Sequence, residues 1–387
     1  MNLTPGQAAR AAFLALLPAA AAAGAKALPV LLCLTAILST APSRLRQAIE
    51  KNLLFLALLG TFAMWATISS AWTPAENHLQ AVKLAILVPL GAIFVSAAAG
   101  SGSSARLTRA GGLAAFGVLT ILLAIEAAGD LPLGRAVNPN STIDELSQNP
   151  ARGIVVLIAL VWGVAAHLFR TRARAWGVAA LVAAAALSPQ FGSLATAFAF
   201  GLGALAFALA FASPRIAILS PTLLLSFWMI AAPFLTPLLF SSQQFVDALP
   251  WSWAHRVEIW KYVSARIVEQ PWVGRGLDAV RAVTDRIEVR DVDLRAVATH
   301  PHSASLHIWY DLGAIGALLA AAAIFVGGWR LSQVCRDDRF GAAAAAAALT
   351  AFGLIANVSY SAWQEWWIAT MFVAAAFVGA VLSDRPA

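Results

Sequence analysis

Three of the six histidines fall within eight residues, in "HPHSASLHIWYDLG", where a polar segment turns into a long apolar run. A neutral imidazole can accept a proton near pH 7, because its unperturbed pKa is about 6.5. His302 is therefore a candidate proton acceptor or substrate-positioning group, and the alternative is a cap on the helix that follows. His307 and Asp311 stand four residues apart and are predicted to pair on that helix. His300 is predicted to be a loop residue.

Several basic residues could bind an anionic substrate. An arginine guanidinium stays charged and binds phosphate oxygens in bidentate fashion, which makes Arg256 the first candidate for holding a phosphorylated group. Arg275 in a "GRG" turn, Lys83 just inside an apolar run and Arg152 at the start of another are further candidates for substrate binding. The alternatives are a solvated charge for Arg256 and Arg275 and, for Lys83 and Arg152, contact with lipid headgroups.

The segment "AWQEWW" places Glu365 beside aromatic residues that could contact sugar rings, although anchoring at the membrane interface also explains its tryptophans. A metal site at His300 and His302 is not predicted, because a His-x-His pair without nearby carboxylates is a weak signal. Cys33 and Cys335 lie in unrelated contexts, and we expect from them neither a disulfide nor a metal site.

The composition is that of a membrane protein. Of the 387 residues, 60% are hydrophobic and only 12% are charged, and the mean hydropathy is +0.76. Soluble domains carry about 25% charged residues. Apolar runs long enough to cross a hydrocarbon core of about 30 Å recur along the chain, and in lipid they must be helical. The net charge of +7 comes mainly from short loops, so it does not indicate binding to nucleic acid.

The hydropathy pattern predicts an all-α polytopic fold of about twelve transmembrane helices, at 8–23, 27–41, 53–72, 80–99, 111–128, 153–169, 175–188, 193–212, 216–240, 304–328, 341–360 and 365–382. The first two are short enough to form one hairpin. The N-terminal run ending in "PAAAAAGAKA" also resembles a signal peptide, and we expect it to be retained.

The distribution of lysine and arginine among the loops predicts the orientation. Alternate loops carry basic residues, whereas the loops 73–79, 188–193 and 361–365 between them carry none. The positive-inside rule then places both termini in the cytoplasm and the long polar segment outside it. Three parts follow: nine spans in 1–240, an extracytoplasmic loop domain in 241–303, and three spans in 304–387.

The long polar segment is predicted to be mostly helical. Its first helix carries an apolar stripe that includes Trp253 and Trp260, ends at Pro271, and is expected to lie at the membrane interface. A lid that only caps the bundle is the alternative. A second short helix is predicted at about 277–287, after the "GRG" turn.

The order of these motifs resembles the O-antigen ligase and polymerase family of bacterial envelope glycosyltransferases. The strong part of the resemblance covers about sixty residues, at Arg256, Trp260, Pro271, Gly274, Gly276, His302, Ser303, Gly313 and Gly316. It continues more weakly around Lys83, around Arg152 and at 362–367. Many members carry an arginine in an "SRG" segment where this chain has Gln190 and Phe191, so another cation must replace it here. We read Gly313 and Gly316 as helix-packing residues that set the angle of the helix after His302.

The resemblance implies a GT-C-like enzyme of the bacterial inner membrane that uses a lipid-linked donor on the periplasmic side. An O-antigen ligase would transfer an undecaprenyl-diphosphate-linked O-antigen to a sugar hydroxyl of lipid A–core, with inversion and without a metal or cofactor. His302 and Arg256 would be catalytic, and Arg275, Lys83, Arg152, Glu365 and Trp260 would bind substrate. Its partners would be these two glycolipids and membrane lipids.

Three alternatives stay open. Within the family, an O-antigen polymerase would join two similar donors, and a protein O-oligosaccharyltransferase would use a serine or threonine as acceptor. The single large loop rich in basic residues favours the ligase over the polymerase. A transporter or flippase is disfavoured, because the span centres are almost free of charge and no internal repeat is visible.

Overall fold

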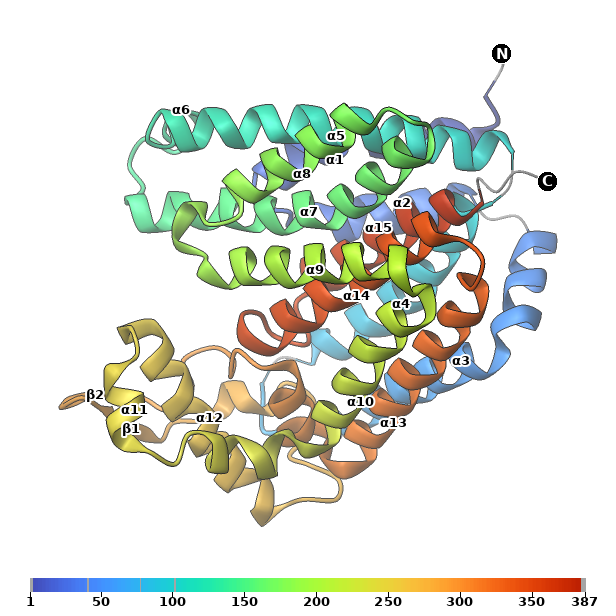
Figure 1. The fold of residues 1–387 in the computed structure, drawn as a ribbon. Helices are drawn as coiled ribbons and strands as arrows, with labels where there is room; N and C mark the ends of the chain where they lie inside the picture. The colour runs from blue at the N-terminus through green and yellow to red at the C-terminus, as the bar shows by residue number, and fades with distance from the viewer. Residues whose placement is uncertain (1–2, 40–41, 77, 101, 384–387) are drawn as a thin grey trace.

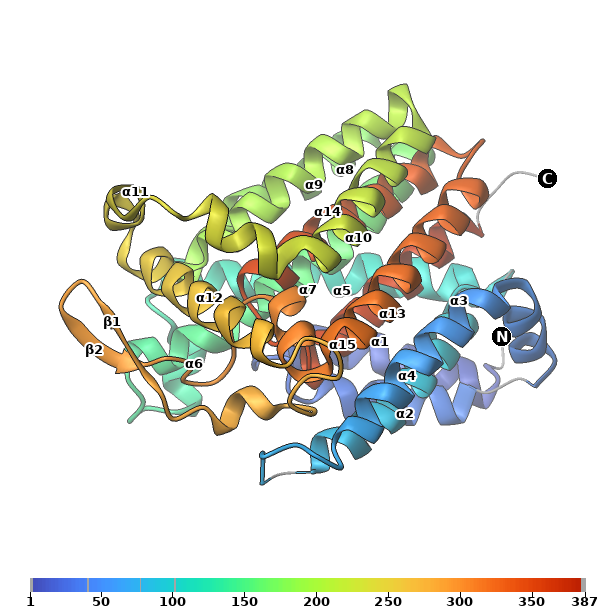
Figure 2. The same ribbon diagram turned by 90° about the horizontal axis from the view of Figure 1, so that it is seen from below.

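The computed structural model describes residues 3–39, 42–76, 78–100 and 102–383 (Figure 1). Almost every element in this part of the chain is a helix, and its two strands form a single small hairpin. Figures 1 and 2 show the long helices as one bundle, with the segment that follows α10 gathered at one end. We call this the insert end. The chain is a multi-pass membrane protein, as its composition predicts.

Nine helices in the described part of the chain are long and apolar enough to cross a membrane. They are α3 (Pro42–Ser69), α4 (Leu79–Ala98), α5 (Ser103–Ala128), α7 (Ile143–Arg170), α9 (Leu194–Ala212), α10 (Pro214–Leu239), α13 (Ala304–Val334), α14 (Arg339–Val358) and α15 (Glu365–Leu382). The predicted number of twelve is therefore wrong. Two predicted spans form helices of 12 and 14 residues, α2 (Leu28–Ser39) and α8 (Arg174–Leu187). At about 1.5 Å per residue they are shorter than a hydrocarbon core of about 30 Å.

The first helix, α1 (Pro5–Ala22), is also outside the nine. Its second turn carries Arg10, which donates hydrogen bonds to the carbonyl of Ala97 and the hydroxyl of Ser104. α1 packs against α2 through a turn in which Gly24 and Ala25 have positive φ, so the two helices form the hairpin that their short lengths suggested. Residues 40 and 41, at the end of the second predicted span, lie outside the described residues.

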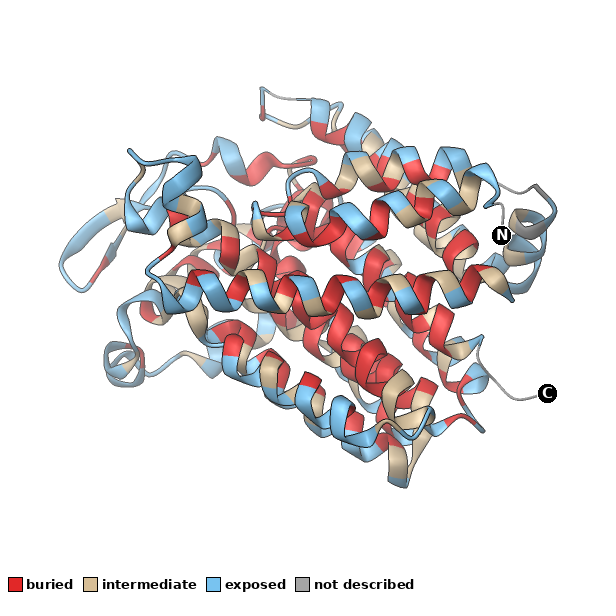
Figure 3. Ribbon diagram, turned by 90° about the horizontal axis from the view of Figure 1, so that it is seen from above, coloured by how far each residue is buried: buried red, intermediate tan, exposed pale blue. Residues whose placement is uncertain are grey.

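Helix α7 forms the centre of the bundle. Every residue from 153 to 166 is buried, and the helix packs against α1, α5, α8, α14 and α15. Figure 3 shows buried residues through the middle of the bundle and exposed ones on its outer faces. Large apolar side chains such as Phe198, Leu205 and Leu224 are exposed there. An apolar outer surface is what a helix bundle presents to lipid.

The segment between α10 and α13 is only partly helical. It contains α11 (Gln243–Ala248), α12 (Trp251–Glu269), the 3₁₀ turn η2 (Ala279–Ala282) and the antiparallel strands β1 (Arg286–Val289) and β2 (Val292–Arg295). The predicted helix at 277–287 is therefore wrong. Arg290 and Asp291 both have positive φ, which matches the tight turns that join two-residue hairpins, and Arg286 bonds Asp293 across the strands at 2.6 Å.

Helix α12 ends at Glu269, just before Pro271, as predicted. Its stripe does not face a membrane interface, however. Val257 and Trp260 are buried and Trp253 is half-buried, and the helix packs against α10 and α13. The tryptophans on this stripe therefore pack on protein, and the position of α12 at a membrane interface stays a prediction.

Helix α13 is broken at Gly313, which has φ 64° and ψ −165°, a conformation that is essentially restricted to glycine. A Cβ there would lie 2.3 Å from the carbonyl oxygen of Trp272. The "GRG" turn fills the break: Gly276 N–H donates to Asp311 O at 2.8 Å, and Ala314 N–H donates to the carbonyl of Pro271 at 2.7 Å. Gly313 thus breaks the helix and sets the direction of its first turns, whereas the prediction was an unbroken helix that a neighbouring helix approaches closely.

Gly316 differs from its prediction. A Cβ on Gly316 would meet the side chain of Leu312, 2.2 Å away on the same helix just before the break. Its small size therefore accommodates the break in α13, whereas the prediction was a close approach by a neighbouring helix.

Candidate active site

His302 occupies the last turn before α13 and has a left-handed backbone, with φ 56°. Its Nδ1 lies 2.7 Å from the carbonyl oxygen of Ser359. Because a carbonyl can only accept, Nδ1 carries the proton and Nε2 keeps the lone pair. The cap of α13 is Ser303, whose hydroxyl accepts from Leu306 N–H. His302 itself is not the capping residue.

The start of α13 is held against the last turn of α14 and the loop that follows it. The hydroxyl of Ser305 donates to Asn357 Oδ1 at 2.7 Å, and His307 Nδ1 lies 3.3 Å from the hydroxyl of Ser361. From the other side, Trp260 Nε1 donates to the carbonyl of Pro301 at 2.8 Å. This geometry gives Trp260 a positioning role for the residue that follows Pro301, and its contact with substrate stays a prediction.

Arg256 on α12 is half-buried and lacks a carboxylate partner among the described residues. One Nη donates to the carbonyl of Ser252 at 3.0 Å, and the guanidinium lies over the ring of Trp253, 5.6 Å from its centroid. Its Nε is buried without a hydrogen-bond partner. Burial lowers the pKa of Arg256, an effect that an acidic neighbour would oppose. A buried guanidinium with an unused donor is suited to an anionic ligand.

The charges of two arginines affect the pKa values of His302 and of Tyr360, a residue that was not singled out from the sequence. Burial and the charge of Arg256 lower the pKa of His302 to about 4, so its imidazole is neutral at pH 7. Burial raises the pKa of Tyr360 to about 12, while Arg152 and Arg256 both act in the opposite direction. The charges of the two arginines therefore act on the same phenol. We call Arg152, Arg256, His302 and Tyr360 the cationic cluster.

Arg152 joins this cluster from α7. Its guanidinium lies over the ring of Trp366 at 5.8 Å, and it donates to Asn149 Oδ1 at 3.4 Å. The ring of Trp366 meets that of Tyr360 edge-on at 4.7 Å. Within the described part of the chain, Arg152 likewise has no carboxylate within ion-pair distance. The cluster therefore holds two cations without counter-charges.

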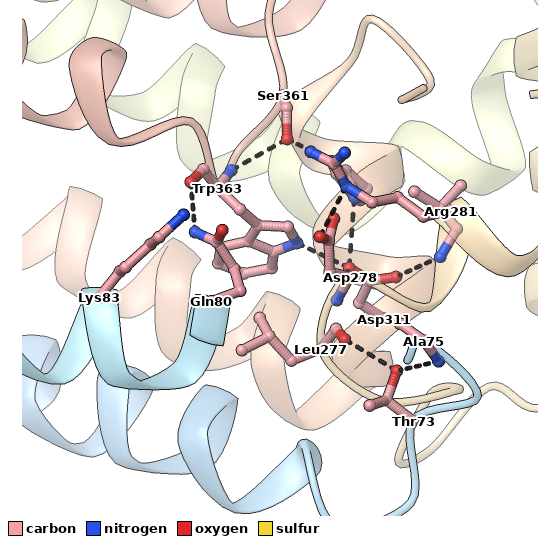
Figure 4. Close-up of polar contacts among 12 residues, drawn as sticks. Thr73, Ala75, Gln80, Lys83, Leu277, Asp278, Arg281, Asp311, Ser361 and Trp363 are labelled. Carbon is pink, nitrogen blue, oxygen red and sulfur yellow. Dashed lines mark hydrogen bonds and ion pairs between the residues drawn. The ribbon is translucent and has the colours of Figure 1, made fainter. Parts of the chain in front are cut away.

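The remaining predicted binding residues lie elsewhere and are paired with carboxylates. Arg275 bonds Glu269 at 2.6 Å and lines a cavity of about 610 Å³. Lys83 and Glu365 bond each other at 2.6 Å and line a second cavity, of about 580 Å³. Neither cavity is lined by a residue of the cationic cluster. We call the second one the Lys83 cavity, and Figure 4 shows part of its wall.

His307 and Asp311 form the predicted pair, with His307 Nε2 3.2 Å from Asp311 Oδ2 and both side chains fully buried. The carboxylate of Asp311 also accepts from the backbone N–H of Asp278 at 2.8 Å and from Trp363 Nε1 at 2.6 Å (Figure 4). Asp311 thereby ties the loop after the "GRG" turn to the loop before α15. Its role is structural in this arrangement.

Three groups near His302 were not singled out or were undervalued from the sequence. Tyr360 follows the serine that holds His302, and His255 precedes Arg256 and has its pKa lowered by burial and by that arginine. His300 is a loop residue as predicted, but it is buried, and its Nδ1 accepts from His302 N–H at 3.2 Å. Adjacency to Arg256 was the one available signal for His255. Nothing local marks Tyr360, because its neighbours come from distant segments.

Comparison with known proteins adds a relationship. No protein-family profile matches the chain. A protein named "Putative polysaccharide ligase" from Rickettsia bellii is 27% identical over 233 residues, which cover 57% of this chain and 55% of the relative. A protein of similar name from Rickettsia conorii is 28% identical over 133 residues, 33% of this chain and 32% of its own. The chain is a distant homologue of these proteins.

This homology extends over about half of the chain, and the chain spans about half the length of the Rickettsia bellii relative. A third protein of this name, from Rickettsia typhi, is 28% identical over 131 residues, 33% of this chain and 32% of the relative. The chain is therefore similar to proteins named as polysaccharide ligases at the level of distant homology, in agreement with the resemblance predicted from the sequence.

Proposed function

We propose that this chain is a glycosyltransferase of the O-antigen ligase type, which transfers a glycan from a lipid diphosphate to a sugar hydroxyl. One observation carries the proposal: an unpaired, partly buried Arg256 stands within electrostatic range of a neutral His302 whose Nδ1 is held by Ser359. The pair supplies an anion-binding donor and a proton acceptor together. Its distant relatives are named as polysaccharide ligases, which agrees with this chemistry.

In the proposed reaction Arg256 and Arg152 bind the diphosphate of an undecaprenyl-linked O-antigen. The acceptor hydroxyl of lipid A–core attacks the anomeric carbon and gives its proton to His302 Nε2. The bond from that carbon to the phosphate oxygen breaks, and undecaprenyl diphosphate leaves with the electron pair. One displacement inverts the anomeric centre and needs neither a covalent enzyme intermediate nor a resident metal or cofactor. Positioning and charge stabilisation supply the rate gain.

The low pKa of His302 in the free protein is compatible with this role. The charge of Arg256 contributes to it, and a diphosphate bound to that guanidinium would offset the charge. Donor binding would then raise the pKa of His302 and make Nε2 a stronger base. The imidazole would thus gain basicity when the leaving group is in place.

We also propose that the insert end faces the periplasm and that both termini face the cytoplasm. Arg109 and Arg170 donate to the carbonyls of Ala380 and Val381, in the last turn of α15. Arg109 in α5 and Arg170 at the end of α7 therefore lie at the end of α15 opposite Glu365, which starts that helix. A positive cytoplasmic side agrees with this arrangement. The donor would then be lipid-linked, since nucleotide sugars are cytoplasmic.

Reconstitution tests the proposal. Purified protein is incubated in detergent with undecaprenyl-diphosphate-linked O-antigen and lipid A–core, without ATP or an ion gradient. We expect a covalent glycan–lipid A–core product and release of undecaprenyl diphosphate. Product that appears only when an energy source is added, or glycan extended on undecaprenyl diphosphate instead, would contradict the ligase assignment.

A further inference from the structure

The Lys83 cavity has a balanced set of charges, unlike the cationic cluster. Lys83 bonds Glu365 at 2.6 Å, and Arg281 bonds Asp278 at 2.7 Å. Both pairs line the cavity. Each of these two cations is therefore already neutralised. The lining also contains Arg295, which donates to the backbone carbonyls of Val283 and Arg281, and Glu76, so that its cations and carboxylates are equal in number. A phosphate group would have to compete with these carboxylates, so the lining favours an uncharged polar ligand.

Two oxygens in residues of the cavity wall lack partners. Asp278 Oδ1 and Gln364 Oε1 are each buried and accept no hydrogen bond, and both residues line the cavity. Asp278 is only 5% exposed, and burial raises its pKa. A buried acceptor without a donor is costly, and a ligand O–H group that reached either oxygen would remove that cost. Sugars carry several such groups.

The cavity also adjoins the cationic cluster. The short segment between α14 and α15 connects the two regions. Its Ser359 carbonyl accepts the hydrogen bond of His302, and Trp363 and Gln364, four and five residues further on, line the cavity. A ligand seated in the cavity therefore contacts the same segment that holds His302.

We propose that the Lys83 cavity is the acceptor subsite and binds an uncharged sugar through hydrogen bonds to Asp278 and Gln364. This inference rests on the proposed function, since an acceptor is defined by the transfer reaction. The two regions then divide recognition: the cationic cluster binds the phosphorylated donor, and the cavity binds hydroxyl groups of the second substrate.

The test measures binding to the two regions separately, with the full-length protein in detergent. The probes are undecaprenyl diphosphate and the outer-core oligosaccharide released from lipopolysaccharide and dephosphorylated. Gln364→Met keeps the size of the side chain and removes its acceptor, and Asp278→Asn replaces the carboxylate. The matched control is Gln333→Met, an exposed glutamine at the other end of α13.

We expect Gln364→Met to weaken oligosaccharide binding by about tenfold, as expected for one lost hydrogen bond to a buried group. Asp278→Asn keeps one acceptor oxygen and should weaken it less, and both variants should leave undecaprenyl diphosphate binding unchanged. Gln333→Met should bind both probes as the parent does. Melting temperatures show whether each variant is folded, and Gln364→Met provides the test if Asp278→Asn unfolds.

Unchanged oligosaccharide affinity in folded Gln364→Met would overturn the inference, as would an absence of oligosaccharide binding in the parent protein. In either case, undecaprenyl diphosphate binding that depends on Arg256 would leave the proposed function standing. Weakened donor binding in Gln364→Met would also overturn the inference, because the cavity would then serve the donor.

Discussion

The cationic cluster and the Lys83 cavity contain similar residue types but pair them differently. In the cluster, Arg256 and Arg152 have aromatic and carbonyl neighbours, and no carboxylate of the described residues lies within ion-pair distance of either. In the cavity, Lys83 and Arg281 each bond a carboxylate within 3 Å. The number of cations in a region is thus a poor indicator of anion binding. A better indicator is whether each cation already has a carboxylate partner.

The largest expected effect concerns the proton acceptor. His302→Ala should lower kcat for transfer by about 10³-fold, within the range for loss of a general base, while donor binding stays near that of the parent. Radiolabelled transfer in membranes measures the first, and binding of undecaprenyl diphosphate measures the second. The exposed His78 provides a control, His78→Ala, which should keep full activity. Activity within fivefold of the parent in His302→Ala would remove histidine from the mechanism.

The next effect concerns the unpaired cation. Arg256→Gln should lower kcat/KM by about 10²-fold, because the charge that stabilises the leaving diphosphate is lost. Arg256→Lys should recover only part of it, since an ammonium lacks the bidentate fork. Arg286→Gln, on the exposed hairpin, is the matched control. Equal activity of Arg256→Gln and Arg286→Gln would show that an arginine without a carboxylate partner does not mark the anion site.

The pH dependence of kcat/KM should respond to a change in the cationic cluster and not to a change in the Lys83 cavity. In the parent, kcat/KM should fall as pH decreases through about 4, because protonated His302 cannot accept a proton. Removal of the charge in Arg256→Gln should move this acid limb to higher pH, since that charge helps to lower the pKa. Arg281→Gln in the cavity should leave the limb in place. A limb that stays fixed in Arg256→Gln would mean that the two groups are not coupled.

The smallest effect is expected for the paired cation. Lys83→Met should change donor affinity by less than about twofold, because Lys83 is half exposed and its charge is matched by Glu365. Titration with undecaprenyl diphosphate measures this, and Glu365→Gln is the companion variant. A tenfold loss of donor affinity in Lys83→Met would place the diphosphate in the cavity and reverse the assignment of the two regions.

The fold was predictable to the extent that hydropathy encodes it. Each apolar run forms a helix, but only helix length and polar content decide which helices can span, and α2 and α8 are too short. The hairpin at 286–295 was missed because its strands are only four residues long and contain charged residues, a pattern that also fits the exposed face of a helix. Likewise, no sequence pattern reveals that Gly313 breaks α13, since a small residue in a membrane helix usually indicates close packing.

The candidate site was predictable in its motif residues and not in their partners. His302 and Arg256 are brought within electrostatic range, 46 positions apart in the chain. Whether a cation is neutralised depends on contacts between distant segments. Lys83 bonds Glu365 from the other end of the chain, whereas no carboxylate of the described residues lies within ion-pair distance of Arg256. Such pairings need the three-dimensional arrangement.

The hydrogen bond from His302 to the carbonyl of Ser359 has a consequence for turnover. Nδ1 donates to a carbonyl, which cannot take up a proton, so a proton bound at Nε2 cannot be passed on through Nδ1. In the proposed reaction the ring can store a proton but cannot relay it inward. The proton must leave from Nε2, to water or to the departing diphosphate. Transfer to the diphosphate would couple regeneration of the enzyme to release of the spent lipid carrier.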